Sequence, residues 1–252
     1  MLGQRQAPIP RHGGPRRKHP ISVNQCELVV PQVRYFSDGG YVVFELPLGK
    51  AVFRCPQRFR HRPAQCDLLH LDVWHNGVNL LRDAGTYSYN CEQPWQDYFK
   101  SAAAHNTVQF DDHDQMPKLT RFLFGQWPKL HVDVDLEAAE PHAQAGFADW
   151  RGCRHQRTVT LANAELAVED AVGGFKEKAV LRWRLAPEFE WSLDDGVCRS
   201  ETCTLQVESD GVKLERGMTE GRESLYYLEK TPLPVLEVTV REPTTITTQI
   251  QL

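Results

Sequence analysis

The sequence lacks several features that would place it in a common functional class. No apolar run approaches the ~20 residues that a membrane-spanning helix needs. The seven cysteines are odd in number and include no C-x-x-C pair, so zinc-ribbon spacing is absent. Isolated buried thiols are the expectation, with a disulfide framework as the alternative. The net charge of -4 at pH 7 gives no electrostatic reason to expect a nucleic-acid partner.

The opening segment has no acidic residue up to Ser22 and is rich in Arg, Pro and Gly. The basic run Arg16-Arg17-Lys18 is followed by no apolar stretch, so the segment does not have the pattern of a secretory signal peptide. We interpret residues 1–34 as a disordered basic lead-in and residues 35–252 as one β domain. If the intact protein is exported, its signal is expected upstream of this chain.

Sustained helical periodicity is also missing, and short β-rich segments separated by turn residues take its place. Only residues 95–104 (WQDYFKSAAA) are predicted to be helical. Asn76-Gly77 predicts a tight hairpin, because both residues accept positive φ. Ser209-Asp210-Gly211 predicts another. The expected strands are residues 40–46, 51–55, 68–74, 78–81, 131–136, 158–161, 166–172, 179–185, 204–208, 212–215, 235–241 and 244–252. This spacing predicts an all-β, antiparallel sandwich or barrel.

Polar residues are densest between His61 and Asp114. Strand alternation puts His70 and Asp72 on one face, where they suit a general base, a metal ligand or a structural pair. Asp83 follows a hairpin and suits either a turn cap or a functional carboxylate. His105-Asn106 opens another strand and suits either a turn cap or contact with a ligand.

Several separated phrases resemble one family in the correct order. They are DLLHLDVWHNGVNLLRDAGTYSYN, AHNTVQFDDHDQM, RHQRTVTL, VLRWRLAP and ESLYYLEKTPLPVLEV. From about Phe36 to the C-terminus, the chain resembles the C-terminal domain of the heparinase II/III-like polysaccharide lyases. The resemblance implies a large antiparallel multi-sheet β-sandwich, which the family pairs with an N-terminal (α/α) toroid. Residues 1–34 are too few for a toroid, so we expect it to be absent from this chain.

The resemblance further implies cleavage of uronic-acid-containing polysaccharides by β-elimination. A base removes the proton α to the uronate carboxyl, an acid protonates the leaving oxygen, and the carboxylate must be neutralised. In the family, a Tyr and part of the catalytic set come from the toroid. His70 and His105 are the catalytic candidates in this chain.

Four residues near these histidines are candidates for substrate binding. Arg82 suits carboxylate recognition, Tyr87 and Tyr89 suit stacking on sugars, and Asn106 offers an amide. Surface charge and core packing are the alternatives for each of them, and the same alternatives apply to His155 and Arg157.

The resemblance also implies a zinc site in several members. It is formed by the second His of a His-x-His-x-Asp segment, the Asp of a D-x-G turn and the His of the H-N-T motif. Asp67, Asp83 and His105 match by position, but the two upstream His positions fall on Pro63 and Gln65. Gln is a poor zinc ligand, so Asp83 and His105 remain as the metal candidates. Without zinc, Gln65, Asp83 and His105 are expected to form a hydrogen-bonded cluster.

Three functions stay open at this point. The first is the C-terminal domain of a polysaccharide lyase, inactive or weakly active alone, with an acidic polysaccharide and a helical toroid as partners. The second is a non-catalytic module that binds acidic polysaccharide, and a weaker third is a structural domain that packs on a partner chain. Family resemblance implies the periplasm or cell envelope as the location.

Overall fold

The computed structural model describes residues 33–58, 64–163 and 165–252. These residues belong to one unit, which runs from Pro31 to Leu252. Residues 1–32 of the predicted disordered lead-in lie outside the described residues. Pro63, at one of the two upstream His positions, also lies outside them. The first described strand begins at Val33, two residues inside the predicted lead-in.

The described residues form many short strands and two short helical segments. In chain order they are β1 (Val33–Phe36), β2 (Tyr41–Leu46), β3 (Gly49–Arg54), β4 (Leu71–His75), β5 (Val78–Leu81), α1 (Gln93–Tyr98), the 3-10 turn η1 (Ala102–Ala104), β6 (Val108–Phe110), β7 (Lys118–Thr120), β8 (Leu123–Phe124), β9 (Leu130–Asp135), β10 (His142–Ala148), β11 (Arg154–Ala162), β12 (Glu165–Gly173), β13 (Ala179–Arg184), β14 (Ser192–Asp194), β15 (Val197–Arg199), β16 (Thr204–Ser209), β17 (Glu215–Glu223), β18 (Thr231–Val240) and β19 (Thr244–Gln251).

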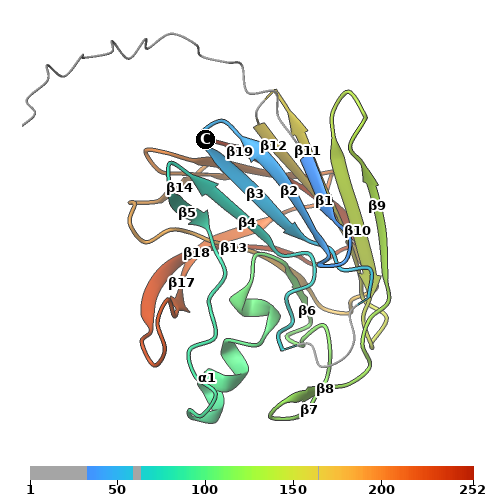
Figure 1. Cartoon of the computed structure of the whole chain (residues 1–252), viewed down its shortest axis with the longest axis vertical. Coiled ribbons are helices and arrows are strands. Elements are labelled where there is room, and N and C mark those ends of the chain that lie inside the picture. The colour runs from blue at the N-terminus through green and yellow to red at the C-terminus, as the bar shows by residue number, and fades with distance from the viewer. Residues whose placement is uncertain (1–32, 59–63, 164) are drawn as a thin grey trace, which may run out of the picture. The chain divides into compact units, whose positions relative to one another are not determined.

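The strands form three main antiparallel sheets and one small ribbon (Figure 1). One sheet has the order β1-β2-β3-β4-β5. A second has the order β14-β15-β16-β19-β12-β11-β10-β9, and a third has β17-β18-β13-β6, while β7 and β8 form the ribbon. The prediction of a large antiparallel multi-sheet β-sandwich is therefore confirmed.

Alternation along the strands explains why the sheets stack. In β2, the side chains of Val42, Phe44 and Leu46 are buried, and the residues between them are partly exposed. Apolar residues from all three main sheets join one buried cluster, in which Trp183 of β13 is completely buried. The six cysteines among the described residues are unpaired thiols, five of them buried, as expected for isolated core thiols.

The helix predicted at residues 95–104 is shorter than expected. Helix α1 ends at Tyr98, and after a break the 3-10 turn η1 begins at Ala102. Ser101 lies between them with an extended backbone (φ -80°, ψ 162°), and its hydroxyl donates to the Tyr98 carbonyl. This local hydrogen bond competes with helix continuation, which a count of helix-forming residues does not reveal.

Of the two turn predictions, one is confirmed and one is wrong. Asn76 and Gly77 take φ of 49° and 80° and connect β4 to β5 as expected. The residues around Asp210 do not close a hairpin, because β16 pairs with β15 and β19 while β17 pairs with β18 in another sheet. The turn signal is local, whereas the partner of β16 is chosen by burial of its apolar face.

Candidate functional site

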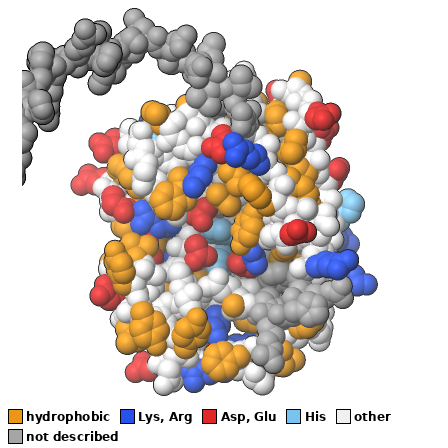
Figure 2. Space-filling view, in the orientation of Figure 1, with side chains coloured by type: hydrophobic (Ala, Val, Ile, Leu, Met, Phe, Trp, Pro, Cys, Tyr) orange, Lys and Arg blue, Asp and Glu red, His pale blue; other side chains and the backbone are white. Residues whose placement is uncertain are grey.

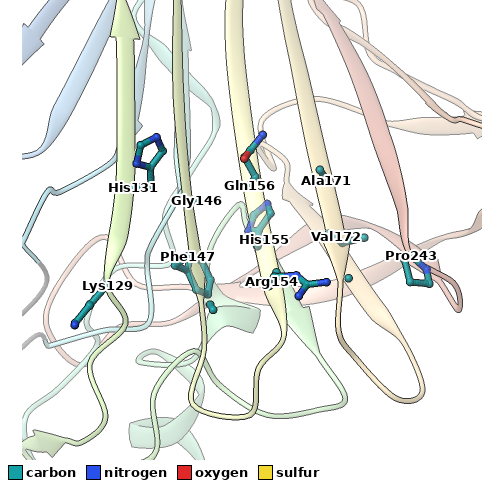
Figure 3. A pocket seen from close by; sticks show the side chains of 12 residues that line it. Lys129, His131, Gly146, Phe147, Arg154, His155, Gln156, Ala171, Val172 and Pro243 are labelled. Atoms are coloured by element: carbon teal, nitrogen blue, oxygen red, sulfur yellow. The ribbon is translucent and has the colours of Figure 1, made fainter.

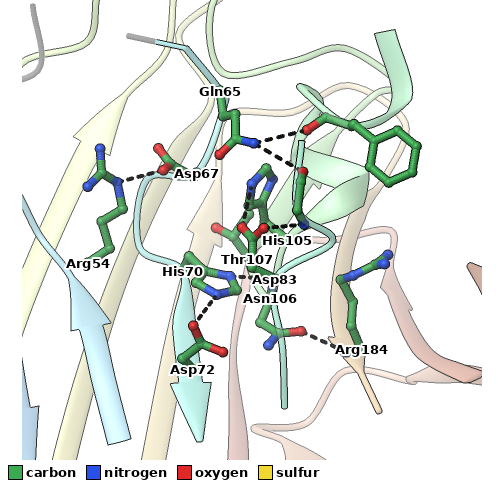
Figure 4. Close-up of polar contacts among 12 residues, drawn as sticks. Arg54, Gln65, Asp67, His70, Asp72, Asp83, His105, Asn106, Thr107 and Arg184 are labelled. Atoms are coloured by element: carbon green, nitrogen blue, oxygen red, sulfur yellow. Dashed lines mark hydrogen bonds and ion pairs between the residues drawn. The ribbon is translucent and has the colours of Figure 1, made fainter. Parts of the chain in front are cut away.

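An ion pair between Asp83 and His105 forms the centre of the polar constellation (Figure 4). Asp83 follows the end of β5, and His105 follows η1, so two separate loops bring the side chains together. The His105 Nε2 atom lies 3.0 Å from Asp83 Oδ2. The imidazole is fully buried, whereas the carboxylate is one third exposed.

The groups around His105 favour its protonated form. Its Nδ1 atom lies 2.8 Å from the Ser101 carbonyl oxygen, which only accepts, so Nδ1 carries a proton. Its Nε2 atom faces the Asp83 carboxylate as an ion-pair contact without a hydrogen bond. The carboxylate charge favours the protonated imidazole, and a protonated His105 is not available as a general base.

The pKa directions of the pair agree with that state. Burial alone would raise the pKa of the Asp83 carboxyl, but the charge of His105 brings it well below its usual range. Burial alone would lower the pKa of His105, but Asp83 outweighs it and raises the pKa above its usual 6.5.

We expect this pair to stabilise the fold most strongly between about pH 4 and about pH 6.5. The raised pKa of His105 gives a contribution that is complete below its unfolded pKa and is lost as pH rises through the folded value. The lowered pKa of Asp83 gives a contribution that is lost as pH falls through its folded value. Urea unfolding of wild type and Asp83→Asn across this pH range measures the difference in their free energies of unfolding. If the two free energies change with pH in parallel, the ion pair does not contribute as expected.

Gln65 lies beside the pair without bonding to it. Its amide Nε2 donates to the backbone oxygens of Gly85, at 3.3 Å, and Phe99, at 3.4 Å. The expected hydrogen-bonded cluster of Gln65, Asp83 and His105 therefore forms only in part: the ion pair is present, and Gln65 holds the neighbouring backbone. This places the Gln65 amide at the loop that carries Asp83.

A zinc ion at the Asp83–His105 pair would have only two protein ligands. Among the described residues, no third His, Cys, Asp or Glu completes a ligand group with Asp83 and His105. Zinc sites take three or four protein ligands, so these residues do not fit the ion by themselves. Zinc binding here stays a prediction.

Gln65→His should create the missing nitrogen ligand and raise zinc affinity at this pair by at least about tenfold. Metal analysis after equilibrium dialysis measures the stoichiometry of wild type and variant. Stoichiometric zinc in wild type that disappears in His105→Gln would show that Gln65 does not prevent binding.

His70 packs beside His105, with the two imidazole rings nearly perpendicular and their centroids 5.6 Å apart. Its Nδ1 atom accepts the Asn106 backbone N–H at 2.9 Å, so the neutral ring carries its proton on Nε2. That Nε2 atom lies 3.6 Å from Asp72 Oδ2. His70 and Asp72 therefore lie on one face, as strand alternation predicted, with His70 buried.

Asn106 is fully buried, so the structure gives it a positioning role in place of the predicted substrate contact. Its Nδ2 donates to the Leu71 carbonyl at 2.9 Å, and its Oδ1 accepts the Arg184 backbone N–H at 2.7 Å. The side chain thereby joins β4 to β13. It fixes the backbone that presents His105.

Arg82 is also engaged internally. Its Nη1 lies 3.1 Å from Glu223 Oε2, its Nη2 lies 2.7 Å from Glu188 Oε2, and its Nε donates to the Asn79 carbonyl. The guanidinium is 4% exposed, whereas the Glu188 side chain is half exposed. A substrate carboxylate would therefore have to displace Glu188 to reach Arg82.

Behind the site, Arg157 and His155 form a buried polar network with Asp170. Arg157 binds Asp170 with two hydrogen bonds, and its Nη1 donates to the carbonyls of Leu69 and Asn106. Strand β11 thereby supports, from the eight-stranded sheet, the segment before β4 and the loop that carries His105. The RHQR phrase consequently has a structural role.

A hollow of about 470 Å³ opens in front of Asp83. Trp74, Asn79, Arg82, Glu188 and Leu225 help to line it. Of the charged pair, only Asp83 borders this hollow.

An aromatic surface lies near the loop that follows Asp83, and Figure 2 shows hydrophobic side chains gathered on this face over α1. We define the aromatic surface by Tyr87, Tyr89, Trp95, Tyr226 and Tyr227. Tyr89, Tyr226 and Tyr227 are between 62% and 70% exposed, which is unusual for rings of this size. The Leu228 N–H donates to the Tyr87 carbonyl, which brings the two segments together.

Tyr87 and Tyr89 are predicted from the sequence as substrate contacts, whereas Tyr226 and Tyr227 are not. The signal was the Leu-Tyr-Tyr-Leu run, which shows no strand alternation and therefore suits an exposed turn. Lys230 covers part of this surface, with its Nζ 4.7 Å from the Tyr87 ring centroid and 4.6 Å from that of Trp95.

A second hollow, of about 490 Å³, lies on the eight-stranded sheet (Figure 3). Lys129, His131 and Arg154 give it a basic lining. His155 also borders it, but its Nε2 atom lies 2.6 Å from Asp170. This hollow shares no lining residue with the one in front of Asp83.

A family model described as heparinase II/III-like, C-terminal, matches residues 6–244. No curated protein matches the sequence significantly. No helix among the described residues is long and apolar enough to cross a membrane.

Solved structures with the same fold include three heparinases. The heparan sulfate lyase HepC from Pedobacter heparinus has a TM-score of 0.70 at 16% identity and covers 87% of this chain and 36% of its own. A heparinase III structure has a TM-score of 0.72 at 15% identity, with the same coverage. A heparinase III gene product with methylated lysines has a TM-score of 0.69 at 19% identity, and the match covers 87% of this chain and 35% of that structure. The chain thus spans about a third of the length of these structures.

Proposed function

Because the chain belongs to the heparinase II/III-like C-terminal family of polysaccharide lyases, we propose that it is the sandwich part of an enzyme that cleaves uronic-acid-containing polysaccharides by β-elimination. The observation that carries this proposal is the Asp83–His105 ion pair, whose carboxylate borders a hollow near the aromatic surface. Exposed tyrosines offer stacking faces to sugar rings.

Proton transfer in this reaction needs groups that reach the substrate. His70 and His105 are both buried, and the Nδ1 atom of each is engaged by a backbone group of this chain. The charged groups that line the hollow are Asp83 and Glu188, which repel a uronate, and Arg82, which is already paired with two carboxylates. We therefore propose that a helical toroid supplies the acid, the base and the carboxylate-neutralising groups, and that this chain alone is inactive.

Heparan sulfate is the first polymer to test, because one fold neighbour is named a heparan sulfate lyase. Ultraviolet absorbance of the unsaturated uronate product measures cleavage by the 252-residue chain and by a version joined to a family toroid. We expect no product from the chain alone and product from the joined protein. Product from the chain alone would overturn the need for a toroid, and none from either protein across heparan sulfate and alginate would overturn the lyase proposal.

A binding module without catalysis is the second candidate, favoured by Gln65 at the position where the family has a zinc-binding His. Affinity electrophoresis with heparan sulfate tests it directly. Replacing both Tyr226 and Tyr227 with Ser should weaken binding by about tenfold, whereas Phe36→Ser, an exposed aromatic on β1, should leave it unchanged. Binding without cleavage by the joined protein would favour this second function.

We also propose a periplasmic or cell-envelope location, because polymers of this class are met outside the cytoplasm. Fractionation of cells that express the intact protein tests this. Recovery in the cytoplasmic fraction would contradict it.

A further inference from the structure

Three side chains with metal-binding atoms converge at a place that the proposed lyase function does not use. His113 follows β6, and Asp149 and Cys153 lie in the connection between β10 and β11. One ligand atom from each residue lies within 4.8 Å of the other two. Within residues 33–58, 64–163 and 165–252, this is the single such group of three His, Cys, Asp or Glu residues.

The carboxylate of Asp149 is held in one orientation by the turn around it. Its Oδ1 accepts the backbone N–H groups of Arg151, at 2.8 Å, and Cys153, at 2.9 Å. Its Oδ2 lies 2.6 Å from His113 Nε2. Backbone donors that fix one carboxylate oxygen and direct the other at a ligand are the supporting contacts that metal sites require.

Both other ligands are largely removed from water. The His113 side chain is 8% exposed, and its Nδ1 atom is buried without a hydrogen-bond partner among the described residues. Cys153 is 2% exposed, and burial raises the pKa of its thiol to about 11, so the sulfur is protonated in the absence of a cation. A hollow of about 300 Å³, lined by Asp111, Arg151 and Lys176 among others, borders Cys153.

We propose that His113, Asp149 and Cys153 bind a divalent cation of the zinc class. Imidazole nitrogen, carboxylate oxygen and thiolate sulfur are the ligand types that zinc accepts, and magnesium and calcium do not favour sulfur. Three protein ligands leave a fourth position for water from the neighbouring hollow. This site is distinct from the Asp83–His105 pair, because it shares no residue with it.

Binding requires a small rearrangement with a balanced proton count. The cation enters between His113 and Asp149, whose contacting atoms must move from 2.6 Å to about 3.3 Å apart around ligand bonds of about 2.1 Å. The imidazole proton moves from Nε2 to the unpartnered Nδ1, and the thiol proton passes to solvent as the sulfur–metal bond forms. The bound cation ties the loop after β6 to the β10–β11 connection.

Cobalt(II) is a suitable probe, because thiolate ligation gives a charge-transfer band that other ligands do not. The metal-free 252-residue chain is titrated with Co²⁺ and then with Zn²⁺, which should displace it. We expect a stoichiometric band in wild type and its loss in Cys153→Ser. Cys203→Ser, which changes another buried thiol, should retain the band, and so should His105→Gln.

Two further variants keep the result interpretable if Cys153→Ser unfolds. Asp149→Asn retains the oxygen that accepts the turn N–H groups, and His113→Gln changes a side chain in a loop; each should weaken Zn²⁺ binding by at least about tenfold. Circular dichroism verifies folding of every metal-free protein. A folded wild type without the band, a band that persists in Cys153→Ser, or unchanged affinity in His113→Gln and Asp149→Asn would each overturn the proposal.

Discussion

Replacing Arg157 with Met is expected to lower the free energy of unfolding by about 3–5 kcal/mol, because it leaves the Asp170 charge buried without its cation. Both side chains are completely buried, and Arg157 also satisfies the carbonyls of Leu69 and Asn106. In the native protein, burial and the neighbouring Arg157 charge lower the pKa of His155, so Arg157 is the cation that balances Asp170. Urea denaturation monitored by tryptophan fluorescence measures the loss.

Arg182→Met is the matched control on β13. Arg182 pairs with Glu237 at 2.7 Å, but Glu237 is 31% exposed, so its loss should cost no more than about 1 kcal/mol. Combining Arg157→Met with Asp170→Leu should recover much of the lost stability, because the unpaired charge is then removed. Equal losses in Arg157→Met and Arg182→Met would show that the buried network does not have the role assigned to it.

Gly85→Ala is expected to destabilise the protein by about 2–4 kcal/mol and to distort the loop that presents Asp83. Gly85 has φ of 79°, a conformation that favours glycine. A Cβ atom there would lie 2.2 Å from the Ser224 carbonyl oxygen, so the backbones must separate. Thermal and urea unfolding measure the stability, and the pH profile of the His105 ion pair reports the loop.

Gly77→Ala separates the cost of the positive φ from the cost of the close contact with Ser224. Gly77 has nearly the same φ, 80°, but a Cβ atom there would meet nothing within 4 Å. Gly77→Ala should therefore lower the free energy of unfolding only by the cost of the positive φ, about 1 kcal/mol. If the two variants lose the same stability, the close approach of Gly85 to Ser224 contributes nothing.

The sequence was informative where structure is decided locally. The β-rich run at residues 40–46 predicted the strand that β2 forms, and Asn76-Gly77 predicted a turn, because backbone conformation depends on near neighbours. The same local reasoning gave the wrong answer around Asp210, since a turn residue does not specify which strand β16 will pair with.

For the candidate site, sequence motifs identified the residues but not their burial or their partners. Asp83 and His105 were selected together, and they meet at 3.0 Å. Asn106 and Arg82 were selected as ligands for substrate, yet both are buried and engaged with other parts of the chain. Exposure depends on which distant segments pack over a residue, and no local pattern reports that.

The amino-acid sequence by itself determined the all-β class, the family and the positions of the polar motifs, because periodicity and motif order are properties of the chain. Only the tertiary structure decided that Asp83 faces His105 and favours its protonated form, that Arg157 supports the site from another sheet, and that His113 meets Asp149 and Cys153. These outcomes arise between residues dozens of positions apart. Charge, burial and ligand geometry depend on distances in space, and packing of the sheets sets those distances.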